Sequence, residues 1–237
     1  LRSLEELEAA RAGYGDAART VLVQANGTVN QQGAIADYLE VDPGYERAVE
    51  ACLGDLLQYV VVDRPEHAVA GIERVREAGA GRCGFLIASA QGPAAFDSAQ
   101  AREAGHYDRH DATDVATDVA TDVVSGFSRT VAGGLRRLSS VARVTGPFAE
   151  AIRHAMGEAW IADSYERARE ASGHISQPVV TAEGVVFRGP HLVTGGGHRG
   201  DRGILEMKGE IKELGERIRV DRDALARLAE ETAAIES

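Results

Sequence analysis

The feature that most restricts the fold of this chain is a narrow apolar seam in its C-terminal segment. Apolar side chains recur there at alternating spacings of three and four residues, at Ile204, Met207, Ile211, Leu214, Ile218, Leu225, Leu228 and Ile235. Only Asp221 and Thr232 interrupt the repeat. A strict repeat of this kind keeps one stripe along a helix, as in a coiled coil. Such a helix would reach about 45 Å at about 1.5 Å per residue, too far to fold back into a compact core.

A seam of this length requires a second helix, and the N-terminal segment offers one. That segment is rich in Glu, Ala and Arg and carries apolar or aromatic side chains at Leu1, Leu4, Leu7 and Tyr14. If the two ends pair with each other, their helices must run antiparallel. In the alternative interpretation, each end is a separate amphipathic helix that lies on the domain. Because no Met precedes Leu1 and no Gly or Pro stop follows Leu228, we expect a fragment of a longer protein.

Between the two ends, the apolar pattern changes to that of an α/β domain. The run of valines within 56–63 indicates a strand that is covered on both faces. A helix over 65–78 begins with a proline, and 84–88 indicates the next strand. Upstream, a helix over 44–53 follows Asp42, which we expect to be its N-cap.

A second block repeats this order from Gly146 onward. The predicted elements are helices at 148–156 and 164–171 and strands at 159–162, 179–180 and 185–187. In both blocks a helix, a glycine, an apolar strand, an aspartate and another helix follow one another, which predicts two related subdomains. We therefore expect a mixed α/β fold in five segments: an N-terminal coiled-coil end (1–20), subdomain I (21–90), a linker with three Ala-Thr-Asp-Val tetrads (91–145), subdomain II (146–202) and a C-terminal coiled-coil end (203–237).

The charge balance and the cysteines exclude several classes of protein. Acidic side chains outnumber basic ones by 37 to 26, so the formal charge of -11 repels phosphate backbones unless basic residues cluster locally. Cys52 and Cys83 form neither a disulfide framework nor a CxxC metal motif, and we expect two reduced, buried thiols. The sequence has no apolar run of membrane-spanning length and no signal segment, so we expect a cytoplasmic protein without a membrane partner.

No pattern in the sequence marks a catalytic centre. A resemblance to a phosphate-binding turn is confined to four glycines, Gly195, Gly196, Gly197 and Gly200. These glycines lack the GxxxxGK[ST] motif, and a structural use of their backbone freedom is the more natural interpretation. His106 and His110 have no convincing further metal ligands, and Ser125 lacks the glycines of a GxSxG turn. We expect no catalytic residue, metal or cofactor in this chain.

Four segments of the chain follow one another in the order and spacing of a known family. They are Ala36 to Gly54, Val60 to Asp63, Gly81 to Leu86 and Pro178 to Gly196. Together with the block from Gly146 they resemble the hinge of the structural maintenance of chromosomes (SMC) proteins, and bacterial members look most similar. The resemblance covers most of 26–197.

This resemblance implies a hinge at the far end of a long antiparallel coiled coil whose other end carries an ATPase head. Two hinges would form a homodimer that holds two coiled-coil arms together. The implied role is chromosome condensation and segregation in the nucleoid, with ATP binding outside this chain and with condensin-type partner subunits. DNA is a further implied partner.

The resemblance also indicates which residues make the contacts. Family dimers use edge strands and a glycine-rich stretch, whose matching positions here are Gly184, Gly189, Gly195 and Gly196. The sequence departs from the family pattern at Ala182, Glu183 and Pro190, and Pro190 removes a backbone donor. Some family hinges bind DNA near the coil junction, where Arg199, Arg202, Lys208 and Lys212 could supply a basic patch. Ordinary surface charge on a coiled coil is the more natural interpretation of these four residues, and DNA contact is the secondary one.

Two other interpretations of the chain compete with the hinge. An α/β nucleotide- or ligand-binding domain with coiled-coil flanks would need a nucleophile, a metal cluster or a phosphate loop. A repair ATPase of the zinc-hook type would need a CxxC motif at its apex, and the sequence has none.

Overall fold

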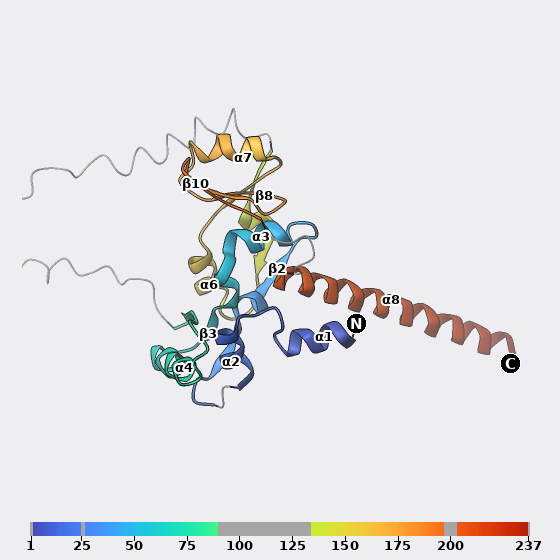
Figure 1. Ribbon diagram of the computed structural model, residues 1–237. Helices are drawn as coiled ribbons and strands as arrows, with labels where there is room; N and C mark the ends of the chain where they lie inside the picture. The colour runs from blue at the N-terminus through green and yellow to red at the C-terminus, as the bar shows by residue number, and fades with distance from the viewer. Residues whose placement is uncertain (1, 25–26, 90–133, 197–202, 237) are drawn as a thin grey trace, which may run out of the picture.

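The computed structural model describes residues 2–24, 27–89, 134–196 and 203–236, and Figure 1 shows a body from which one long helix protrudes. The first block of the body contains β1 (Gln31–Ala34), the 3-10 helix η1 (Ile35–Tyr38), β2 (Leu39–Val41), α3 (Glu46–Leu53), the 3-10 helix η2 (Gly54–Gln58), β3 (Val60–Val62), α4 (Pro65–Glu77) and β4 (Phe85–Ile87). The second block contains β5 (Leu135–Arg137), the 3-10 helix η4 (Leu138–Ser140), β6 (Ala142–Val144), α6 (Ala149–Met156), β7 (Trp160–Ala162), α7 (Tyr165–Ser172) and β8 (Val179–Thr181). The second block ends with a hairpin of β9 (Val186–Arg188) and β10 (Leu192–Thr194).

The sheets repeat the same pairing in both blocks. The first block forms a three-stranded sheet in the order β1-β3-β4, where β3 is antiparallel to β1 and parallel to β4. The second block forms a five-stranded sheet in the order β10-β9-β8-β7-β5, where β7 is antiparallel to β5 and parallel to β8. The strands β2 and β6 join the blocks as an antiparallel pair with Glu40 opposite Arg143.

Local sequence accounts for several of these elements. All three valines of β3 are fully buried, which confirms the prediction of a strand covered on both faces. Helix α4 begins with Pro65, whose missing N–H has no intrahelical partner at that position in any case. Helix α7 begins after Ser164, whose hydroxyl accepts a hydrogen bond of 3.3 Å from the backbone N–H of Arg167.

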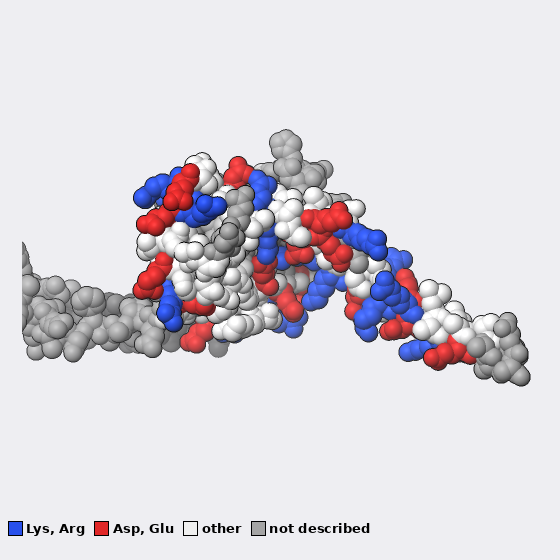
Figure 2. All heavy atoms as spheres, turned by 90° about the horizontal axis from the view of Figure 1, so that it is seen from below, with Lys and Arg blue, Asp and Glu red and all other residues white. Residues whose placement is uncertain are grey.

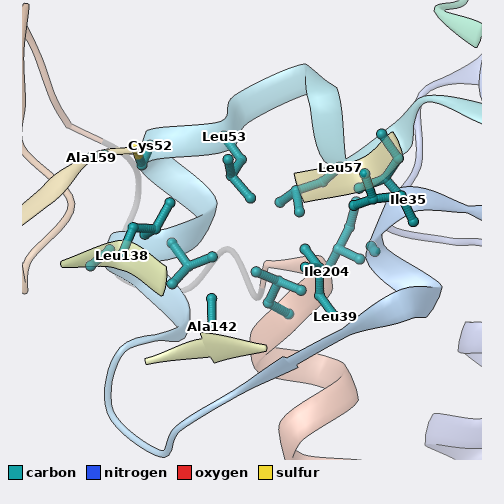
Figure 3. Close-up of a cluster of buried hydrophobic side chains, with 14 of the residues drawn as sticks. Ile35, Leu39, Cys52, Leu53, Leu57, Leu138, Ala142, Ala159 and Ile204 are labelled. Carbon is teal, nitrogen blue, oxygen red and sulfur yellow. The ribbon is translucent and has the colours of Figure 1, made fainter. Parts of the chain in front are cut away.

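One hydrophobic core joins the two blocks to the long helix. Its fully buried side chains include Ile35 and Leu57 from the first block and Leu138 and Ile152 from the second. Figure 3 shows Ile204, from the first turn of the long helix, entering the same cluster. Since burying one such side chain contributes about 2 kcal/mol, the base of the long helix is firmly attached to the body.

The chain ends leave the body as the sequence predicts, with one correction. Helix α8 (Ile204–Glu236) protrudes as a single helix, and α1 (Arg2–Ala9) runs antiparallel along its first part (Figure 1). The predicted N-terminal coiled-coil end over 1–20 is too long. Tyr14 is buried in the body, and α2 (Asp16–Gln24) packs on β1, β3 and α4 rather than on α8.

Three further predictions differ from the structure. The predicted strand over 56–63 begins only at Val60, because Gly54–Gln58 forms η2. Helix α3 has no side-chain cap, and the carboxylate of Asp42 lies 3.3 Å from Arg143 instead. The predicted linker over 91–145 contains β5, η4 and β6, so the second block begins earlier than Gly146. The Ala-Thr-Asp-Val tetrads lie outside the described residues.

Candidate functional site

The first candidate contact surface is the outer edge of the five-stranded sheet. Strand β10 is the last strand of that sheet, and it pairs with β9 on its inner side. Leu192 and Val193 are 50% and 47% exposed, so the edge presents apolar side chains as well as backbone groups. An exposed apolar edge strand is a template for pairing with another chain.

The second candidate contact surface is the outer edge of the three-stranded sheet. Strand β4 has the position in the first block that β8 has in the second, since each is parallel to the preceding strand of its block. In the second block β9 covers the outer side of β8, whereas no described strand covers the outer side of β4. Within the described part of the chain, the outer side of β4 is therefore an unpaired sheet edge.

The four glycines assigned to the dimer contact all lie in or beside the β9–β10 hairpin. Gly184 has a φ of +86°, and an added Cβ would lie 3.2 Å from Arg47, so packing within the chain already requires it. A Cβ added to Gly195 would likewise lie 3.2 Å from the side chain of Val185. Gly189 and Gly196 have positive φ and open space around them. The hairpin thus brings these residues together, and their part in a dimer contact stays a prediction.

Pro190 does not weaken the β9–β10 pairing. The register pairs Arg188 with Leu192, so Pro190 lies in the turn between the strands. A backbone N–H in that position is not needed for the ladder, and its loss costs no strand hydrogen bond.

The base of the coiled coil contains an ion-pair network centred on Asp37. The guanidinium of Arg11 donates to Asp37 Oδ1 at 2.6 Å and to Oδ2 at 2.8 Å. The ammonium of Lys208, on α8, donates to Asp37 Oδ1 at 2.8 Å and to Glu8 Oε1, on α1, at 2.6 Å. The side chains of Arg11, Asp37 and Lys208 are each 20% exposed, so water screens this network less than a surface pair.

Asp37 and Tyr14 are among the groups of the network whose pKa values are shifted. Burial by itself would raise the pKa of Asp37, but hydrogen bonds and charge from Arg11 and Lys208 outweigh burial and lower it. Burial raises the pKa of Tyr14, whose hydroxyl accepts a hydrogen bond of 3.1 Å from Arg11. Asp37 is therefore a stable carboxylate at neutral pH.

A second carboxylate holds the N-terminus of α8. Glu50, on α3, accepts the backbone N–H of Ile204 at 2.8 Å and also accepts from Leu205. An added Cβ on Gly203 would clash with the Glu50 carboxylate, so this glycine permits the contact. Burial raises the pKa of Glu50. Because a carboxylate already occupies this helix N-terminus, its N–H groups are not open to a phosphate, and Gly197 and Gly200 of the predicted turn lie outside the described residues.

The four cations assigned to DNA do not form one patch. Arg199 and Arg202 lie outside the described residues. Lys208 is engaged with two carboxylates, and Lys212 is 74% exposed with Glu40 at 3.6 Å. Figure 2 shows acidic and basic side chains interleaved along α8. DNA contact at the coil junction therefore stays a prediction, with Lys208 the least accessible of the described cations.

The remaining sequence candidates give no reactive centre within the described ranges. Cys52 is buried and Cys83 half-buried, and burial raises the pKa of the Cys83 thiol to about 11. His106, His110 and Ser125 lie outside the described residues. Where the structure describes the chain, no three His, Cys, Asp or Glu side chains converge as a metal site. No described helix combines the length and the apolar character that crossing a membrane requires.

In the described residues, the β4 and β10 edges lie on a body whose ends leave as one antiparallel coiled coil, and together these features define a coiled-coil joint. Residues 28–172 match the family described as SMC proteins Flexible Hinge Domain, and the chain belongs to that family. The family resemblance inferred from the sequence is confirmed.

The chain is similar to two bacterial proteins called chromosome partition protein Smc. The protein of Myxococcus xanthus is 28% identical over 220 residues, which are 90% of this chain and 16% of that protein. The protein of Halothermothrix orenii is 31% identical over 86 residues, which are 36% of this chain and 7% of that protein. The chain therefore spans only a small part of the length of these relatives.

Solved structures of SMC hinges share the fold. An asymmetric dimer of the Geobacillus stearothermophilus SMC hinge domain aligns with a TM-score of 0.74 at 22% identity, over 98% of this chain and 85% of that one. The Pyrococcus furiosus SMC hinge domain aligns with a TM-score of 0.52 at 27% identity, over 86% of this chain and 94% of that one. The mixed α/β hinge fold expected from the sequence is confirmed.

Proposed function

We propose that this chain is the homodimerisation hinge of an SMC chromosome partition protein and joins two coiled-coil arms. The observation that carries the proposal is the complementarity of the two sheet edges. Among the described residues, no strand of the first block has the position that β9 has in the second, and the second block ends in an exposed apolar strand, β10.

A two-fold arrangement satisfies both edges at once. If β10 of the first copy lies beside β4 of the second copy, the two-fold symmetry also places β10 of the second copy beside β4 of the first. Each contact extends a sheet across the copies through backbone hydrogen bonds. The exposed side chains of Leu192 and Val193 would be buried against the partner. Two such contacts close the dimer on itself, because each copy uses its β4 and its β10 once.

The direction of α1 and α8 indicates how a dimer would connect to the rest of the protein. Both chain ends point away from the body on the same side, as Figure 1 shows. A dimer would therefore present two coiled coils that connect the hinge to domains elsewhere in the protein. The ATPase heads, the association with the nucleoid and any condensin-type subunits belong to that whole protein, and this chain contributes the joint.

The test is the solution mass of the chain by light scattering during gel filtration at several concentrations. The monomer mass is 25.1 kDa, and the proposal expects twice that value, persisting on dilution. Val193→Lys on β10 should shift the mass to the monomer, because a buried lysine without a partner opposes the contact.

A matched control is available on the same chain. Val69 on α4 is 55% exposed and lies on neither edge strand, so Val69→Lys should remain dimeric. A parent chain that is monomeric at every concentration, or a Val193→Lys variant that stays dimeric, would contradict the proposal.

A further inference from the structure

Helix α8 is attached to the body first at its own N-terminus. The carboxylate of Glu50 accepts the backbone N–H groups of Ile204 and Leu205, and both of these side chains are buried. Met207 is buried as well, but all of these contacts lie in the first turn of α8, so they fix where the helix begins more firmly than its direction. Beyond this point α8 needs a second contact to leave the body at one angle.

The second contact lies one helical turn further along α8, at Lys208. Its ammonium reaches Asp37, which belongs to η1 of the body. The same carboxylate binds Arg11, which lies in the turn that ends α1, through both oxygens. Lys208 also reaches Glu8 on α1. One body carboxylate therefore contacts both chain ends, and the two ends contact each other beside it.

We propose that Asp37 is a shared anchor that sets the angle at which both coiled-coil arms leave the body, with the Glu50 cap as the pivot. The anchor fixes α8 through Lys208 and fixes the end of α1 through Arg11. Without it, α8 would remain attached through the buried side chains of its first turn and through the exposed Lys212–Glu40 ion pair, so the helix would swing about its first turn. The arms would then no longer transmit a defined orientation to the rest of the protein.

The body holds the Asp37 carboxylate in place independently of the arms. The backbone N–H of Ala34 donates to Asp37 Oδ2 at 2.9 Å. Gly33 has a φ of +120°, and an added Cβ there would lie 2.9 Å from the same oxygen, so only glycine leaves room for the carboxylate. Contacts within β1 and η1 therefore position the Asp37 carboxylate without any contribution from α1 or α8.

Arg11 is held in an unusual backbone conformation that fits this role. Its φ is +52°, a left-handed value that a residue with a side chain rarely adopts. The conformation ends α1 and directs the guanidinium at Asp37 and at the ring of Tyr14, which lies 5.1 Å away. A side chain that binds both carboxylate oxygens compensates for the backbone strain.

The angle can be measured as a distance between spin labels on α8 and on the body. Labels at Arg222→Cys and Glu183→Cys, in a Cys52→Ala, Cys83→Ala background, report the direction of α8. Residue 222 lies about 27 Å along the helix from Ile204, so a swing of about 10° moves it by about 5 Å. Each labelled protein is mixed with an excess of unlabelled chain. A dimer then rarely contains two labelled copies, so the measured distance is the one between the two labels of a single chain.

The parent should give one narrow distance distribution, and Asp37→Ala should broaden it by about 5 Å or more. Lys208→Met should broaden the distribution similarly, since methionine keeps an unbranched side chain of similar length but lacks the ammonium group. Asp42→Ala is the matched control, because it removes a carboxylate that pairs with Arg143 and touches neither arm. Circular dichroism establishes that each variant is folded.

Two outcomes would overturn the proposal. One is a distribution as narrow as the parent's in folded Asp37→Ala or Lys208→Met. The other is an equal broadening by Asp42→Ala, which would mean a general effect of lost charge. If Asp37→Ala does not fold, Lys208→Met alone decides the question, because it leaves the Arg11 pair intact.

Discussion

Removal of the Glu50 carboxylate is the perturbation whose size follows most directly from the structure. In Glu50→Ala the N–H groups of Ile204 and Leu205 lose their acceptor at the start of α8. Loss of a helix N-cap costs about 1–2 kcal/mol. In a domain of this size, that lowers the melting temperature by about 2–8 °C.

The burial of Glu50 reduces this loss and gives it a pH dependence. Burial raises the pKa of Glu50, so the folded state favours the protonated carboxyl more than the unfolded state does. The contribution of this group to stability therefore increases as pH falls through its raised folded pKa. Glu50→Gln keeps an oxygen acceptor and removes this titration, so it should be less destabilising than Glu50→Ala.

Chemical denaturation of the three proteins at several pH values is the assay. Amide hydrogen exchange at Ile204 and Leu205 should accelerate in Glu50→Ala more than exchange at β3, which lies elsewhere in the core. Equal stability of the parent and Glu50→Ala, with unchanged exchange at both amides, would refute the assignment of Glu50 as the cap.

Three further predictions follow from the network, the hairpin and the thiols. Because the pKa of Asp37 is lowered from its ordinary 3.8, its stabilising effect is present above that value and is lost as pH falls through the folded pKa. Asp37→Asn should thus flatten the acid limb of a stability–pH profile. Gly184→Val, at a φ of +86° and against α3, should cost about 1–3 kcal/mol in denaturant unfolding. Cys83, with a pKa of about 11, should alkylate with iodoacetamide far more slowly at pH 8 than in the unfolded chain.

The local pattern of the sequence predicts the coiled coil and the repeated blocks well. The three–four repeat around Met207 is a property of neighbouring residues on one helix, and so it is visible without tertiary information. The valines of β3 and the proline of α4 are equally local signals. By contrast, the run before Val60 contains Leu56 and Leu57, and a short apolar run of this kind does not distinguish a strand from a helical turn.

The contacts that attach the arms could not be predicted, because they join distant positions. Glu50 and Ile204 are separated by 154 positions, and Asp37 and Lys208 by 171. Periodicity carries no information about such pairs. Asp37 lies inside a segment that resembles the hinge family, yet its partners became evident only from the fold. From the sequence alone Lys208 is a surface cation or a candidate DNA contact, whereas the structure places it between two carboxylates.

The most direct test of the central claim is a cross-link between β4 of one copy and β10 of another. One chain carries Ile87→Cys and a second, differently tagged chain carries Val193→Cys, both in a Cys52→Ala, Cys83→Ala background. A short bismaleimide can join them, because neighbouring strands lie about 5 Å apart. The account predicts a covalent product that contains both tags. Failure to form that product, in a mixture that light scattering shows to be dimeric, would mean that the copies meet through other surfaces.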